Sequence, residues 1–194
     1  FKIPNVHLHL HKIIPMGAGL GGGSSDAAFT LMGLRDLFDL PLTNQKLIPY
    51  AQKLGSDCAF FLHNGAQFGT GKGEVLAPIP TSLCGLYAIF LYPNFGISTQ
   101  KAYAGIQPNP APGFLPDLLK SPMPTWKHTI KNDFEKTLFV EYPLLAEIKQ
   151  GMYDLGAEYA AMSGSGSTIF GLFKNEVSPK ESWTNFTKWE GFIP

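Results

Sequence analysis

Residues 15–28 of the chain read PMGAGLGGGSSDAA. Five of the seven residues from 17 to 23 are glycine, which is too many for a regular helix or strand. Ser24, Ser25 and Asp26 follow as a typical helix N-terminus, and apolar residues then recur at helical spacing as far as Phe38. The stretch therefore predicts a glycine loop that opens an amphipathic helix. Because backbone N–H groups and the positive end of the helix dipole meet at such a loop, it suits a phosphate group.

Three competing interpretations of the glycine loop are weaker. Gly17, Gly19 and Gly22 satisfy the GxGxxG pattern, but a dinucleotide-binding fold also needs a strand about 20 residues further on that ends in an acidic residue. Here the chain continues through a helical pattern to Pro41. A Walker loop needs a lysine before its Ser or Thr, and none follows Gly23. A loop without a ligand would order five glycines at about 0.5–1 kcal/mol each relative to alanine, which argues for a use.

Composition narrows the class of protein. The chain has 194 residues with 15 basic and 15 acidic side chains, so its formal net charge is zero and we expect no nucleic-acid partner. Two cysteines without CxxC spacing and the lack of a long apolar run predict a cytoplasmic protein with no membrane span. His7, His9 and His11 alternate as exposed strand positions would, and we assign no metal ligand. The sequence starts at Phe1 and enters a strand pattern at once, so we expect a missing N-terminal segment of the same protein.

The remaining pattern alternates helices with strands and predicts an α/β chain, more narrowly an α+β two-layer fold. Periodicity and turn residues predict a strand at 6–10, a helix at 43–54 that Pro49 kinks or splits, a hairpin at 67–76, a buried central strand at 86–92, an irregular loop at 108–124, a helix at 144–155, strands at 159–162 and 168–173, and a terminal helix at 178–189. Pro78 and Pro80 mark a boundary, which gives expected domains at 1–84 and 85–194.

Several motifs occur in an order that resembles the GHMP kinases. The glycine loop at 15–28 is similar to the nucleotide loop of that family and is the most specific match. Supporting segments are Leu54-Gly55-Ser56-Asp57, Gly71-Lys72-Gly73-Glu74, Ile97-Ser98-Thr99, Asn132-Asp133-Phe134-Glu135 and the late glycine motif at 162–167. The resemblance implies a GHMP kinase fold, with part of the nucleotide-binding domain before residue 85 and the C-terminal GHMP domain after it.

The resemblance also implies an activity. The family members that the chain resembles most use ATP and Mg²⁺ to phosphorylate the 2-hydroxyl of a cytidine diphosphate derivative of methylerythritol, in the non-mevalonate route to isoprenoid precursors. We therefore expect a small-molecule kinase with this substrate. Two alternatives stay open: a GHMP kinase for another small alcohol, and a non-catalytic fragment that binds a nucleotide or phosphate. Because those family members carry an upstream Lys-x-Asn segment and an aromatic–His pair, we expect the 194-residue chain to be inactive by itself.

The resemblance assigns roles to particular residues. Those expected to bind ATP are Lys12, Pro15, Gly17, Gly19, Leu20, Gly21, Gly22, Gly23, Ser24 and Ser25. Asp57 is expected to act as the base or the orienting group for the acceptor hydroxyl, whereas local sequence alone favours a helix N-cap. Ser24 or Ser25 is expected to reach Mg²⁺, and helix capping is the alternative for both. For Lys12, the alternative is a solvated lysine at a strand end.

Four later residues are expected to bind the substrate, namely Thr99, Tyr103, Gly164 and Gly166. Tyr103 follows Thr99 by one helical turn and offers an aromatic face for the base, with a helix cap and a core aromatic residue as the alternative. Gly164 and Gly166 would let the late loop close over the phosphate loop or the substrate tail, but a tight hairpin needs the same glycines.

Overall fold

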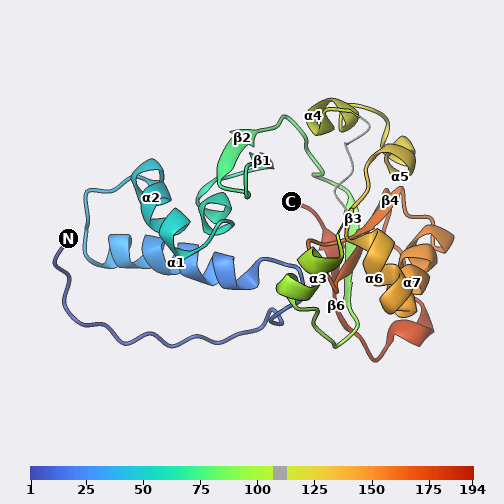
Figure 1. Ribbon diagram of the computed structural model, residues 1–194, viewed down its shortest axis with the longest axis horizontal. Helices are drawn as coiled ribbons and strands as arrows, with labels where there is room; N and C mark the ends of the chain where they lie inside the picture. Colours follow the sequence, from blue (N-terminus) through green and yellow to red (C-terminus); the bar gives the residue numbers. More distant parts are fainter. Residues whose placement is uncertain (107–112) are drawn as a thin grey trace. The chain divides into compact units, whose positions relative to one another are not determined.

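The computed structural model describes residues 1–106 and 113–194, and the chain divides into two compact units (Figure 1). Unit 1 comprises Phe1–Met16 and Gly21–Pro80, and unit 2 comprises Gly17–Leu20 and Thr81–Pro194. The glycine loop therefore contributes to both units, since its first four residues pack with the later part of the chain.

Unit 1 is built on two helices and a hairpin. Its elements are α1 (Gly22–Leu37), α2 (Asn44–Leu54), the 3₁₀ turn η1 (Cys58–Leu62), β1 (Gln67–Thr70) and β2 (Val75–Pro78). The predicted helix after the glycine loop is confirmed, and so is the hairpin, whose register runs from Gln67 opposite Pro78 to Thr70 opposite Val75. The predicted second helix is also confirmed and runs on through Pro49 without being split. A small apolar core joins α1, α2 and η1.

The expected strand at 6–10 is wrong. Residues 1–14, all of them described, contain no strand, and they run as an irregular trace in Figure 1. Leu8 and Leu10, the positions expected to face a core, are 70% and 64% exposed. An alternating pattern becomes a strand only when a neighbouring strand satisfies its backbone groups, and within the described part of unit 1 the sole ladder joins β1 to β2.

Unit 2 contains a four-stranded antiparallel sheet with the strand order β4-β5-β3-β6. Its strands are β3 (Tyr87–Tyr92), β4 (Tyr159–Met162), β5 (Ile169–Phe173) and β6 (Thr187–Phe192). The predicted central strand is confirmed, because β3 lies between two neighbours and Ile89 and Leu91 are wholly buried. The predicted strands at 159–162 and 168–173 are confirmed as β4 and β5.

The expected terminal helix at 178–189 is wrong. The segment holds only the short turn η3 (Glu181–Trp183), and the chain then enters β6. This strand pairs with β3 along its whole length, from Tyr87 opposite Phe192 to Tyr92 opposite Thr187. An edge-to-face contact between the Tyr87 and Phe192 rings, 5.2 Å apart, adds to the pairing. Thr, Trp and Phe favour strands, so local preference and long-range pairing agree here.

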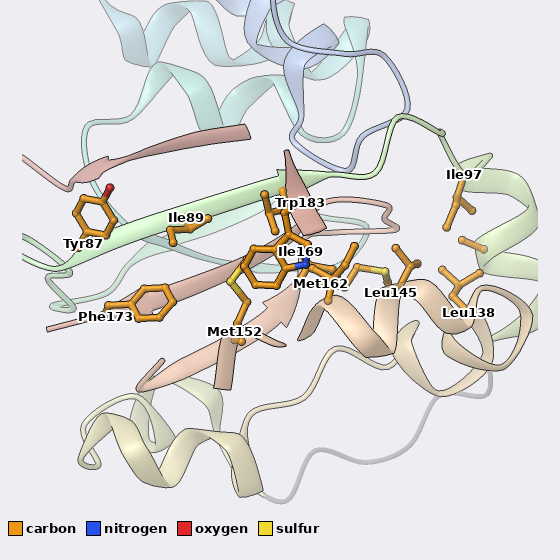
Figure 2. Packing of buried hydrophobic residues seen from close by; sticks show 14 residues of the cluster. Tyr87, Ile89, Ile97, Leu138, Leu145, Met152, Met162, Ile169, Phe173 and Trp183 are labelled. Carbon is orange, nitrogen blue, oxygen red and sulfur yellow. The ribbon is translucent and has the colours of Figure 1, made fainter. Parts of the chain in front are cut away.

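Helices cover both faces of this sheet. They are α3 (Thr99–Gly105), α4 (Leu115–Leu118), the turn η2 (Met123–Thr125), α5 (Trp126–Thr129), α6 (Glu135–Glu141) and α7 (Pro143–Asp154). The main core packs Leu145 and Met152 of α7 against Ile89 and Ile169 of the sheet (Figure 2), and Ile148 belongs to the same cluster. Trp126 belongs to the cluster on the opposite face. The predicted helix at 144–155 is thus confirmed as α7, and none of the described helices is long and apolar enough to cross a membrane.

The expected irregular loop at 108–124 is wrong in its later part. Residues 107–112 lie outside the described residues, but α4 and η2 form in the rest of the segment. Pro116 and Pro124 each stand in the first turn of their element. Proline is tolerated there because the first N–H groups of a helix have no partner within the helix.

Candidate functional site

The first half of the glycine loop, Gly17–Leu20, is bound to the late loop Ser163–Ser167 within unit 2. The Ser163 hydroxyl donates a hydrogen bond to the Gly19 carbonyl at 2.8 Å, and the Thr168 N–H donates to the Ala18 carbonyl at 3.1 Å. Gly19 has φ +75°, and a Cβ added there would lie 2.1 Å from the Ser163 carbonyl oxygen. Both its conformation and its close packing therefore require glycine at this position.

The glycines of the late loop are closely packed as well, Gly164 against the glycine loop and Gly166 against Met162. A Cβ at Gly164, which has φ +53°, would lie 3.0 Å from the Gly19 carbonyl oxygen. Gly166 has φ +87°, and a Cβ there would meet the Met162 sulfur at 2.9 Å. The late loop thus packs against the glycine loop, as well as joining β4 to β5 by the turn that these glycines permit.

The second half of the glycine loop forms the start of α1 in unit 1. Gly21, with φ +64°, is the N-cap residue, and the first helical bond runs from the Ser25 N–H to its carbonyl at 2.9 Å. Among the described residues, no side chain caps this helix. Ser24 and Ser25 therefore lie inside the first turn, and the alternative that either is the cap is wrong. The N–H groups of Gly22, Gly23 and Ser24 precede the helical ladder and are oriented to meet an anion.

Lys12 lies beside this helix start. Its ammonium group forms an ion pair with the Asp26 carboxylate, and the two side chains are only 23% and 33% exposed. A Cβ added at Gly22 would lie 2.9 Å from the Lys12 Nζ. The alternative of a solvated lysine at a strand end is therefore wrong, because Lys12 is paired and the strand is absent from this fully described segment. Pro15 is also half-buried.

Asp57 is the N-cap residue of η1 by position, but its side chain makes no capping hydrogen bond. The N-cap alternative is thus confirmed for the place of the residue and not for its carboxylate, which is exposed. Its carboxylate accepts a hydrogen bond from the Ser56 hydroxyl at 3.3 Å. A Cβ at Gly73, with φ +103°, would lie 3.1 Å from the Asp57 Oδ1. The turn of the β1–β2 hairpin thus faces the carboxylate, and glycine keeps the space beside it open.

Thr99 and Tyr103 lie on α3 in unit 2. Ser98, not Thr99, is the N-cap residue, and the Thr99 hydroxyl lies 3.5 Å from the Ser165 hydroxyl of the late loop. Tyr103 is 62% exposed, so it is not the core aromatic residue of the alternative. Its ring meets Phe134 edge-to-face, with 5.0 Å between centroids, which leaves an open aromatic face.

The candidate residues divide between the two units. Unit 1 brings together Lys12, Gly22 and the start of α1, and separately Asp57 and the hairpin turn. Unit 2 brings together Gly17–Leu20 and the late loop, with Thr99 beside the latter. The described residues include no cluster of three His, Cys, Asp or Glu side chains that could hold a metal ion.

Sequence reasoning assigned no role to Asn132 or Glu135, although their segment was noted for its resemblance. The Asn132 side chain donates to two carbonyls at the end of β4, and the buried Glu135 carboxylate accepts the Met162 N–H. For Glu135 the available signal was a charged residue in an otherwise apolar helix face. This signal could not identify its partner Met162, which lies 27 residues further along the chain.

Comparisons with known proteins define the class. The model of the GHMP kinases N terminal domain matches residues 1–65, and that of the GHMP kinases C terminal region matches residues 114–188. The chain belongs to the GHMP kinase family. The expected α+β fold is confirmed as well, since each unit combines helices with antiparallel strands and a solved kinase of the family superposes on the chain.

Curated relatives point to one kind of kinase within the family. A 4-diphosphocytidyl-2-C-methyl-D-erythritol kinase of Bacteroides fragilis is 46% identical over 184 residues, which is 95% of this chain and 66% of the relative. The kinase of the same name from Bacteroides thetaiotaomicron is 44% identical over 193 residues, or 98% of this chain and 70% of the relative. The chain thus spans about two thirds of the length of these curated relatives.

Solved structures agree. A crystal structure of 4-(cytidine 5'-diphospho)-2C-methyl-D-erythritol kinase is 30% identical and superposes with a TM-score of 0.73 over 93% of this chain and 68% of that one. A homoserine kinase from Cytophaga hutchinsonii, at 18% identity and a TM-score of 0.71, shares the fold.

Proposed function

We propose that the protein phosphorylates the 2-hydroxyl of 4-diphosphocytidyl-2-C-methyl-D-erythritol with ATP, a step in non-mevalonate isoprenoid biosynthesis, in the cytoplasm. The observation that carries the proposal is the uncapped start of α1 behind the glycine loop, where the N–H groups of Gly22, Gly23 and Ser24 have no place in the helical ladder. The relatives named for this reaction support the choice of substrate.

The residues present suit a nucleotide. A Cβ at Gly23 would meet no described atom within 4 Å, so a phosphate oxygen can approach the backbone there. Lys12 adds a positive charge next to Gly22, and the Ser24 or Ser25 hydroxyl would serve as a ligand of Mg²⁺. When bound, ATP with Mg²⁺ supplies the transferable phosphoryl group and neutralises part of its charge. The chain's own part is to position that group and to stabilise negative charge with N–H donors.

Asp57 is proposed to orient the acceptor hydroxyl or to take its proton. The carboxylate is exposed, does not cap η1, and has glycine beside it in the hairpin turn. It is thus free to accept a hydrogen bond from a substrate hydroxyl, as a general base must. Thr99, Tyr103, Gly164 and Gly166 are proposed to bind the substrate, with the open face of Tyr103 available for the cytosine ring. Residues 1–84 and 85–194 are proposed as the two domains.

The test is a substrate panel. The full protein product of the gene is incubated with ATP and Mg²⁺ and with the cytidyl substrate, homoserine or another small alcohol, and ADP release is measured. The proposal expects turnover with the cytidyl substrate at least about a hundredfold above the others. Equal or greater turnover with another alcohol would assign a different GHMP kinase activity. ATP binding without turnover of any alcohol would indicate a non-catalytic nucleotide-binding protein.

A further inference from the structure

We infer that Asn132 and Glu135 are positioning residues for ATP, because they hold the late loop Ser163–Ser167, and this loop holds Gly17–Leu20. The inference rests on the proposed function, since it takes the glycine loop as the nucleotide site. All of these residues belong to unit 2.

Asn132 joins the segment before α6 to both sides of the turn that follows β4. Its amide nitrogen donates to the Met162 carbonyl and to the Gly164 carbonyl, at 2.8 Å in each case. Its amide oxygen accepts a hydrogen bond from the Phe134 N–H at 3.0 Å. Three of the four hydrogen-bonding positions of the side chain, including both donors, are thus occupied, so its orientation is set by three backbone groups.

Glu135 binds the same turn through the backbone N–H of Met162, whereas Asn132 binds the carbonyl. The residue is only 9% exposed, and its Oε1 accepts a hydrogen bond from the Met162 N–H at 2.8 Å. Its Oε2 accepts from the Lys149 ammonium group of α7 at 2.5 Å. A buried charge is costly unless it is paired and hydrogen-bonded, and both conditions are met here. Met162 is therefore held at its N–H by Glu135 and at its carbonyl by Asn132.

The late loop passes this constraint to the glycine loop. Directly after Met162, the Ser163 hydroxyl donates to the Gly19 carbonyl, and a Cβ added at Gly164 would lie 3.0 Å from that carbonyl oxygen. At the far end of the loop, the Thr168 N–H donates to the Ala18 carbonyl. Two consecutive carbonyls of the glycine loop are therefore turned toward the late loop.

Peptide geometry converts this contact into an orientation of donors. In a trans peptide the carbonyl of one residue and the N–H of the next point in opposite directions. Because the Ala18 and Gly19 carbonyls are directed at the late loop, the N–H groups of Gly19 and Leu20 are directed away from it. Loss of the hold by Asn132 would let these two peptide planes rotate, and donors that must meet a phosphate would no longer be preorganised.

The test compares two asparagines in the same unit. Asn132→Asp keeps the shape and the acceptor oxygen but replaces the donating amide by an acceptor. Asn94→Asp makes the same change at a residue whose amide donates to the Asn185 carbonyl, next to the start of β6. Ser163→Ala removes only the hydroxyl that reaches Gly19, and it guards against a folding defect in the Asn132 variant. The dissociation constant for ATP with Mg²⁺ is measured by calorimetry, and exchange of the Thr168 amide is measured by hydrogen–deuterium exchange.

We expect Asn132→Asp to raise the dissociation constant at least about fivefold and Ser163→Ala at least about twofold, with Asn94→Asp within about 1.5-fold of wild type. The double variant Asn132→Asp/Ser163→Ala should raise the dissociation constant by less than the product of the two single effects, because both substitutions act through one loop. Thr168 exchange should accelerate in Asn132→Asp but not in the control. Unchanged ATP affinity in either variant, multiplicative effects, or unchanged exchange would overturn the inference. A wild-type protein that binds no ATP would refute the proposed function, while the exchange data would still decide whether Asn132 holds the loop.

Discussion

Replacing Gly19 by alanine should separate the contribution of the loop-to-loop contact from that of backbone strain. Alanine in the left-handed region, here at φ +75°, costs about 1–2 kcal/mol. The new Cβ would stand 2.1 Å from the Ser163 carbonyl oxygen, so the late loop would have to withdraw by about 0.9 Å to reach a separation of 3.0 Å. Such a shift strains the two bonds from Asn132, and overpacking of this kind costs about 1–3 kcal/mol.

The total loss of unfolding free energy is therefore about 2–5 kcal/mol. For a chain of this size it corresponds to a fall in Tm of roughly 4–20 °C, measured by calorimetry or circular dichroism. Gly85→Ala is the matched control, because Gly85 has φ +81° but a Cβ there would meet no described atom within 4 Å. The control should lose only the strain contribution of about 1–2 kcal/mol.

The comparison gives a clear refutation. If Gly19→Ala lowers Tm no more than Gly85→Ala does, the late loop yields without cost and the close packing has no energetic weight. ATP affinity should also fall in Gly19→Ala and not in Gly85→Ala, and equal affinity in the two variants would contradict the role given to this loop.

Three further predictions concern single residues. Asp57→Asn in the full protein product should lower turnover by a factor of about 10²–10⁴ and leave ATP affinity nearly intact. Asp36→Asn replaces an exposed carboxylate of the same unit and should leave turnover unchanged. A loss of only about threefold in Asp57→Asn would show that Asp57 does not act as the base or orienting group. Gly22→Val should weaken ATP binding at least about tenfold, because a Cβ there would lie 2.9 Å from the Lys12 Nζ and the larger side chain would displace this cation from the helix start. Gly33→Val in the open part of the same helix is the control for helix stability. Burial raises the pKa of Tyr159 above its ordinary value of 10.0. The neutral phenol therefore contributes fully to the unfolding free energy below about pH 10, and this contribution is lost as the pH rises further. The unfolding free energy of Tyr159→Phe, measured from about pH 8 to 12, should therefore decline less steeply than that of wild type, and parallel curves would argue against this assignment.

Local sequence patterns correctly predicted the elements whose burial follows from their own residues. The apolar run of β3 and the stripe of α7 were recognisable because each is buried along its length by residues that the sequence displays in order. The strand expected at 6–10 and the helix expected at 178–189 failed for a shared reason. In both, the outcome depends on whether a distant strand is available for pairing, and periodicity within a short window holds no information about that partner.

The same limit applies to the candidate site. The glycine loop and the start of the helix after it were predicted, because the backbone freedom of glycine and the pattern of a helix start follow from the residue types in that segment. The contact between Gly19 and the late loop joins residues that are 144 positions apart, and no local pattern announces it. Likewise, the hold that Asn132 exerts on Met162 and Gly164 becomes visible only when β4 is in its sheet.

The pairing of β6 with β3 has a consequence for how the protein is made. The residues paired between β3 and β6 are separated by roughly 100 positions, so β3 leaves the ribosome with both flanks open, and the flank that pairs with β6 stays open while α3 to α7, β4 and β5 are synthesised. During that interval the open flank can recruit a strand from another nascent chain. Once β6 docks, its Lys188 and Glu190 give the new outer flank the charges that discourage such association. The timing of this last strand, more than the strength of the core, should therefore govern the yield of soluble protein during expression.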